Sequence, residues 1–171
     1  NNEDKADDYG RIALTPVILQ ESSIPPAASN VVLNKLTQRA PKKGLGADSF
    51  DPRFIITANM VELSHETTAT APAMQALVLS PTLYIGDAAT GTLYATCALK
   101  QIKGAGTNDT KAYMQAVKGI RVDDPAVQRF IETGKKRIIE WYNSQIDFLI
   151  SEANSLAGQD KYDEGIALLF T

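Results

Sequence analysis

The chain has 171 residues, of which 44% are hydrophobic and 22% charged, an ordinary composition for a globular protein with one core and an appendage. The net charge of −3 argues against nucleic acid as a main partner, because phosphate binding needs a basic surface. No apolar run approaches the ~20 residues of a membrane-spanning helix, and a single cysteine excludes an intramolecular disulfide.

Residues 1–10 are polar and acidic, and we expect a disordered leader there. The chain lacks an initiator methionine and stops inside an apparent helix. We therefore expect a piece of a longer protein, from which a targeting or anchoring segment could have been removed; a natural end in a docked helix is the alternative. The run IALTPVIL, residues 12–19, predicts a strand whose Pro16 favours an edge position or a bulge.

Residues 25–39 predict an amphipathic helix that begins with two prolines. Its apolar positions recur every four residues: Ala28, Val32 and Leu36. Residues 53–63 are apolar on both faces, which is typical of a central strand covered on both sides. Residues 64–73 read as a loop or a flexible edge.

Residues 74–106 predict a long β-hairpin with its turn at DAATG. Folding it about Ala89 places Ile85 opposite Leu93 and Leu79 opposite Leu99. The intermediate pairs are Leu83 with Ala95 and Pro81 with Cys97. Side chains alternate in phase on both arms, so all of these fall on one apolar face, which other elements must cover.

A short helix follows, with Tyr113, Ala116, Val117 and Ile120 on one side. A long helix is predicted from residue 124 to about residue 157, roughly 50 Å at the usual rise per residue. Its stripe is Val127, Ile131, Gly134, Ile138, Trp141, Gln145 and Phe148. A turn near Gly158 and a new helix from Tyr162 look like part of a tetratricopeptide-type hairpin.

These elements predict an α+β fold, a mostly antiparallel sheet with a long central hairpin packed by helices. We expect an α/β sandwich domain over residues 11–122. Residues 123–171 would then form the long helix and the start of a helical hairpin.

The segment KGAGTNDTK is the one candidate binding site, because backbone N–H groups at a helix start can hold an anion. Its candidate residues are Lys103, Gly104, Gly106, Thr107 and Lys111. The spacing does not match a phosphate-binding loop, which needs GxxxxGK followed by Ser or Thr. The alternative is a glycine turn followed by Thr107 or Asn108 as a helix cap.

No catalytic residues, cofactor or metal site are expected. His65 and Glu66 resemble half of a zinc-protease motif, but the second histidine is missing. Cys97 and His65 could form a nucleophile–base pair. However, Cys97 falls on the predicted buried face, where a free cysteine behaves as a small hydrophobic residue.

The element order and two short motifs resemble the amino-terminal α/β module of TolB, the lipoprotein activators of penicillin-binding proteins and the CsgG lipoproteins. The first motif is RIALTPV, residues 11–17. In the group, the first strand usually reads as a basic residue followed by IAVxPF. The second is Asp87, Thr90 and Gly91, an Asp-x-x-Thr-Gly turn. Residues 40–53 depart from the group's pattern. The chain also resembles uncharacterised Bacteroidetes envelope proteins that continue into helical repeats.

The resemblance implies a non-enzymatic protein-interaction or assembly module in the periplasm or cell envelope, with an unidentified protein partner; the cytoplasm is the alternative location. It carries no binding residues over to this chain. The alternative function is a small-ligand, nucleotide or anion-binding domain that uses the turn from Gly104 to Lys111.

Overall fold

The computed structural model describes residues 12–19, 23–40 and 53–158. The expected leader and the helical hairpin expected after Gly158 lie outside these ranges. The chain divides into two compact units. One consists of residues 13–134, and the other includes residues 135–158. The sequence placed the boundary before the long helix, between residues 122 and 123, whereas the two units divide within it.

A five-stranded sheet forms the centre of the first unit. Its strands are β1 (Thr15–Pro16), β2 (Phe54–Thr67), β3 (Gln75–Asp87), β4 (Leu93–Ala98) and β5 (Ile102–Gly106). β3 pairs with β2 on one side and with both β4 and β5 on the other, always antiparallel. β1 adds a short parallel pairing to the outer side of β2. The predicted α+β class with a mostly antiparallel sheet is confirmed.

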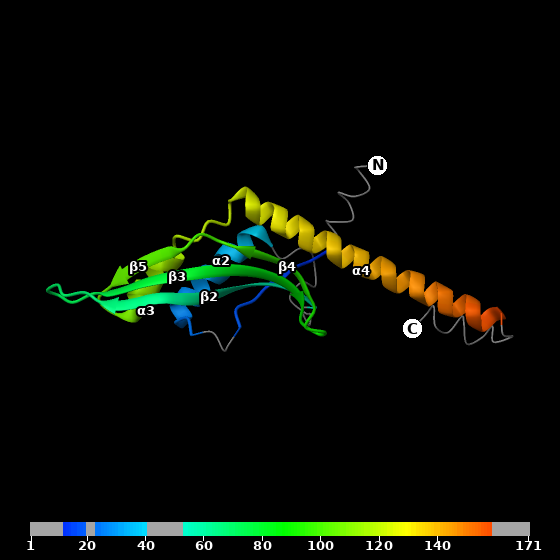
Figure 1. Cartoon of the computed structure of the whole chain (residues 1–171), viewed down its shortest axis with the longest axis horizontal. Coiled ribbons are helices and arrows are strands. Elements are labelled where there is room, and N and C mark those ends of the chain that lie inside the picture. The colour runs from blue at the N-terminus through cyan, green and yellow to red at the C-terminus, as the bar shows by residue number, and fades with distance from the viewer. Residues whose placement is uncertain (1–11, 20–22, 41–52, 159–171) are drawn as a thin grey trace. The chain divides into compact units, whose positions relative to one another are not determined.

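The helices are α2 (Pro26–Arg39), α3 (Asp109–Val117) and α4 (Pro125–Gly158). α2 and α3 contact each other and the strands, and Figure 1 shows both against the sheet. Prolines occupy the first turn of α2, as expected, and Asn108 caps α3 with its side chain. None of the helices in the described ranges combines the length and apolar character needed to cross a membrane.

The hairpin prediction was right about the buried face and wrong about the register. Leu83 pairs with Cys97 and Ile85 with Ala95, a shift of two residues from the expected pairs. A shift of two preserves the side-chain alternation, so Leu79, Leu83 and Ile85 are buried as predicted. Leu93 instead pairs with Gly86 and is 55% exposed.

The second arm of the hairpin was predicted as one continuous strand, but the structure has two strands there. β4 ends at Ala98, and β5 begins at Ile102, which takes the place opposite Leu79 that was expected for Leu99. The 13-residue β3 is long enough to pair with both in succession.

β2 was predicted to be central and covered on both sides, and this is wrong for its second half. The strand continues to Thr67 through the expected loop. Within the described residues, β1 pairs only with Ile55 and Ile56, which leaves the rest of β2 at the sheet edge. Val61 and Leu63 accordingly expose 52% and 49% of their surface.

The core lies between one sheet face and the helices. α2 contributes Ala28, Val32 and Leu36, the three positions predicted from their spacing, and all are buried. The first turns of α4 approach the sheet closely at Gly134, where a Cβ atom would lie 2.6 Å from Ile85 Cδ1. A larger residue at this crossing would require the Ile85 side chain to shift.

Candidate functional site

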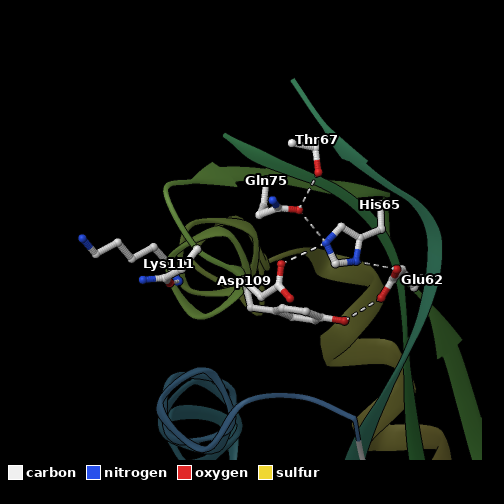
Figure 2. Close-up of polar contacts among 8 residues, drawn as sticks. Glu62, His65, Thr67, Gln75, Asp109 and Lys111 are labelled. Carbon is white, nitrogen blue, oxygen red and sulfur yellow. Dashed lines mark hydrogen bonds and ion pairs between the residues drawn. The ribbon is translucent and has the colours of Figure 1, made fainter. Parts of the chain in front are cut away.

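A polar cluster between β2 and α3 surrounds His65 (Figure 2). The imidazole Nδ1 lies 3.0 Å from Glu62 Oε1. The Nε2 atom lies 2.9 Å from Asp109 Oδ1 and 3.1 Å from Gln75 Oε1. The Tyr113 hydroxyl donates to the second carboxylate oxygen of Glu62 at 2.8 Å. Three side chains thus contact the imidazole directly and a fourth, Tyr113, joins through Glu62, so that the cluster connects β2, β3 and α3.

A β-bulge in β2 makes this arrangement possible. In a regular strand, residues three apart point to opposite faces, so Glu62 and His65 would be separated. The pairing with β3 shifts by one residue between Glu62 and Ser64. Glu62 consequently lies opposite Leu79 and His65 opposite Leu77, two residues that are buried on the helix-covered face. Both polar side chains therefore face α3.

The start of α3 supplies the other side of the cluster. Asn108 Oδ1 accepts from the backbone N–H of Lys111, which fixes the first turn. Asp109 follows as the first residue of the helix, and Tyr113 lies four residues later on the same helical side. This spacing lets one residue bind His65 and the other bind Glu62.

The surroundings shift the pKa values of His65 and Tyr113. Partial removal from water lowers the pKa of His65, but hydrogen bonds and charge attraction, chiefly from Asp109 and then from Gln75 and Glu62, raise it above 6.5 overall. Removal from water and the hydrogen bond to Glu62 raise the pKa of Tyr113 to about 12. Tyr113 is therefore a neutral hydrogen-bond donor at every physiological pH.

The chemistry of the cluster is that of a structural ion pair. Both imidazole nitrogens face carboxylate oxygens, so neither is directed at an open position where a substrate could exchange a proton. The Thr67 hydroxyl is directed to Gln75 Oε1 at 3.3 Å. Within the ranges that the structure describes, no group of three His, Cys, Asp or Glu side chains could hold a metal ion.

The predicted anion-binding residues occupy a helix-packing site. A Cβ atom at Gly104 would overlap the carbonyl oxygen of Ala112, and one at Gly106 would lie 2.6 Å from Lys111 Cβ. The two glycines let β5 lie directly against α3. Lys103 is exposed and alternates with the buried Gly104, so it points away from α3. Lys111 is exposed on the helix, so the two cationic side chains lie on different sides of β5.

Cys97 and His65 do not form a pair. Cys97 lies opposite Leu83 and His65 opposite Leu77, six residues apart along β3, which corresponds to roughly 20 Å. Burial raises the pKa of the Cys97 thiol, to which the Asp124 charge adds, and Arg129 opposes both. The thiol is thus held in its less reactive protonated form.

The second unit presents an exposed apolar surface on α4. Ile146 is 54% exposed, Phe148 is 59% exposed and Ile150 is 47% exposed. Ile146 and Ile150 are four residues apart and share one helical side. The predicted stripe is buried in its first part, at Val127, Ile131 and Ile138, and exposed at Phe148.

Sequence reasoning missed the His65 cluster because its members come from three separate segments. The bulge that aligns Glu62 with His65 has no signature in VELSHET, where the predicted strand ended at Leu63 and SHET was assigned to a loop or a flexible edge. The spacing of Asp109 and Tyr113 on a helix was visible, but only pairing of the strands shows that they meet β2.

No protein-family model matches the chain, and no curated protein is similar to it in sequence. Among solved structures, it is similar to the crystal structure of a "putative lipoprotein" from Caulobacter crescentus, with 9% sequence identity and a TM-score of 0.39. The alignment covers 77% of this chain and 98% of that chain. A likeness of this extent assigns no function to this chain.

Proposed function

We propose that the chain is a non-enzymatic protein-interaction module of the cell envelope, in which α4 supplies the contact surface. The observation that carries this proposal is the exposure of Ile146 and Ile150, each about half accessible and four residues apart on one side of α4. Large apolar side chains gathered in this way are typical of surfaces that pack against another helix or protein.

The charges on this helix support a protein surface. The unit begins with Lys135, Lys136 and Arg137, and the later charges are acidic, at Glu140, Asp147 and Glu152. A basic amphipathic helix would favour an anionic membrane, whereas here the apolar residues are accompanied by carboxylates. The envelope location rests on the sequence resemblance given above, and cell fractionation of the tagged full-length protein tests it.

Photocrosslinking tests the contact surface. A photoreactive residue at Ile146 should crosslink to the partner, while the same residue at Ser144 should not, because residues two apart point to opposite sides of a helix. The variant Ile150→Ser should weaken the crosslinked product seen from position 146, because Ile146 and Ile150 share one helical side. Equal crosslinking from positions 144 and 146 would overturn the proposal.

A matched control uses exposed apolar residues of the sheet. The variant Val61→Ser with Leu63→Ser removes similar surface from β2 and should leave the crosslinked product unchanged. The alternative function, anion binding at the turn from Gly104 to Lys111, remains a prediction, and a thermal-shift screen with phosphate and nucleotides tests it. The separation of Lys103 from Lys111 favours the interaction module.

A further inference from the structure

His65 is the single histidine of the chain and connects three elements that are distant in sequence. It lies on β2, and its ring contacts Gln75 of β3 and Asp109 of α3. The ring also contacts Glu62 of β2, and Glu62 in turn accepts a hydrogen bond from Tyr113 of α3. One imidazole therefore connects the paired strands β2 and β3 to α3.

The hydrogen-bond partners of the two ring nitrogens indicate which protonation state of His65 fits the site. A neutral imidazole has one N–H donor and one lone pair, whereas the imidazolium has two donors. An ionised carboxylate only accepts. Nδ1 faces Glu62 at 3.0 Å and Nε2 faces Asp109 at 2.9 Å, so both nitrogens need a hydrogen atom. In a neutral ring, one lone pair would point at a carboxylate oxygen.

We propose that His65 is a proton-dependent clasp, which as an imidazolium ties β2 to the start of α3 and on losing its proton releases one of these two contacts. The inference is independent of the partner that α4 binds. It assigns the cluster a conformational role that responds to the pH of the surroundings.

The groups that face His65 are consistent with this role. Glu62 of β2 and Asp109 of α3 are acidic, and Gln75 of β3 and Tyr113 of α3 are neutral. β5 contributes Gly104 and Gly106 beside α3, without charge. The Lys111 side chain extends away from the imidazole in Figure 2. Glu66 pairs with Ala76 and alternates with His65, so it lies on the opposite face.

The direction of the pH effect follows from the contacts. The folded state raises the pKa of His65 above its unfolded value of 6.5, so the folded state holds the proton more tightly. The stabilisation is complete below the unfolded pKa and is lost as the pH rises through the folded pKa. The clasp is thus closed below pH 6.5 and opens as the pH rises through the higher pKa of the folded state.

Two segments should loosen when the clasp opens. One is β2 beyond the bulge, residues 64–67, which is held to β3 by strand pairing but to α3 through His65. The other is the first turn of α3, which begins at Asp109. The first turn still has the Asn108 cap, so opening increases local motion without unfolding the domain.

NMR spectroscopy tests the clasp directly, because one histidine gives one imidazole signal. The ring nitrogens of the uniformly labelled chain are followed from pH 5 to pH 9. Below the titration midpoint both nitrogens should carry hydrogen, and the midpoint should lie above that of a histidine in a urea-unfolded sample. Amide-exchange protection factors, corrected for intrinsic exchange, should fall at residues 64–67 and 109–111 as the ring titrates.

Variants distinguish the clasp from a general pH effect. Asp109→Asn and Glu62→Gln should each lower the midpoint, because each removes one facing charge. Glu66→Gln is the matched control, with the same change one residue from His65 but on the other face, and should leave the midpoint unchanged. In His65→Gln, protection at residues 64–67 should be low and independent of pH.

The result that overturns the proposal is a midpoint at or below that of the unfolded chain. Equal shifts in Glu62→Gln and Glu66→Gln would overturn it too. So would protection at residues 64–67 that stays constant through the titration, since the ring would then bind a proton without holding β2 to α3.

Discussion

Gly104 of β5 lies directly beneath Ala112 of α3, so that a Cβ atom at position 104 would overlap the Ala112 carbonyl oxygen and lie 2.5 Å from Ala116 N. The neighbouring groups are helix backbone, which cannot move aside without displacing α3. This contact sets the distance between the strand and the helix that carries Asp109 and Tyr113.

We expect Gly104→Ala to destabilise the protein by about 1–3 kcal/mol or more, the range for overpacked cores. Urea denaturation followed by circular dichroism measures this change. Gly158→Ala is the control, because nothing lies within 4 Å of a Cβ atom there. A Gly104→Ala variant as stable as the Gly158→Ala variant would contradict the close approach.

Lys35 of α2 should stabilise the end of α3. Its ammonium donates to the carbonyl oxygens of Lys118 at 3.2 Å and Ile120 at 2.8 Å, groups that follow the last turn of α3. Lys35→Met keeps the aliphatic stem and removes both hydrogen bonds, and should cost about 1–3 kcal/mol in the free energy of unfolding. Lys103→Met, at an exposed position, should leave it nearly unchanged.

Asp87 should make the turn between β3 and β4 sensitive to acid. Its Oδ1 accepts from the N–H groups of Ala89 and Thr90, and its Oδ2 lies 3.2 Å from Arg53 Nε. Although burial raises the pKa of this carboxyl group, these hydrogen bonds and the Arg53 charge lower it overall. The stabilisation is complete above the unfolded pKa and is lost as the pH falls through the lower folded pKa.

We therefore expect Asp87→Ala to cost about 1–3 kcal/mol at pH 7, because two backbone donors and the Arg53 side chain lose an acceptor. The difference from wild type should shrink at low pH, as measured by thermal unfolding from pH 2 to pH 7. Asp123→Asn, at an exposed position before α4, should track the wild type throughout. A constant Asp87→Ala difference would rule out a role for the ionised carboxylate.

Thr57 should be replaceable by an apolar residue. Its side chain is 7% exposed, and its hydroxyl has no hydrogen-bond partner among the described residues. Thr57→Val preserves the branched shape and removes the buried polar atom, so the free energy of unfolding should rise by about 1 kcal/mol. This corresponds to about 2–4 °C in melting temperature for a chain of this size. The exposed Thr96→Val is the control, and no change in melting temperature should follow.

The sequence predicted the elements better than their pairing. The spacing of Ala28, Val32 and Leu36 located α2, and the long helix was predicted to within about a residue at each end. Alternation identified the buried face of the hairpin but could not fix its register, because a shift of two residues buries the same side chains. The observed register follows an irregularity in the pairing between Ile85 and Gly86, next to the turn at Asp87–Gly91.

The candidate site lay beyond sequence reasoning for a related reason. Gly104 and Gly106 were assigned to an anion-binding turn or a simple turn, and their actual neighbours, Ala112 and Lys111, become visible only when α3 folds back on β5. Sequence reasoning did not connect His65 with its partners Gln75 and Asp109, because they lie 10 and 44 residues away along the chain. Tertiary contacts at such separations leave no local pattern.

The irregularity in β2 has a consequence for self-association. Beyond Ile56, the outer side of this strand has no neighbouring strand among the described residues, and a straight edge of that length would be a template for another chain. The extra residue between Glu62 and Ser64 interrupts the regular repeat of backbone donors and acceptors along it. The same single residue that places His65 on the face of its carboxylates thus also makes this edge a poorer template for another strand.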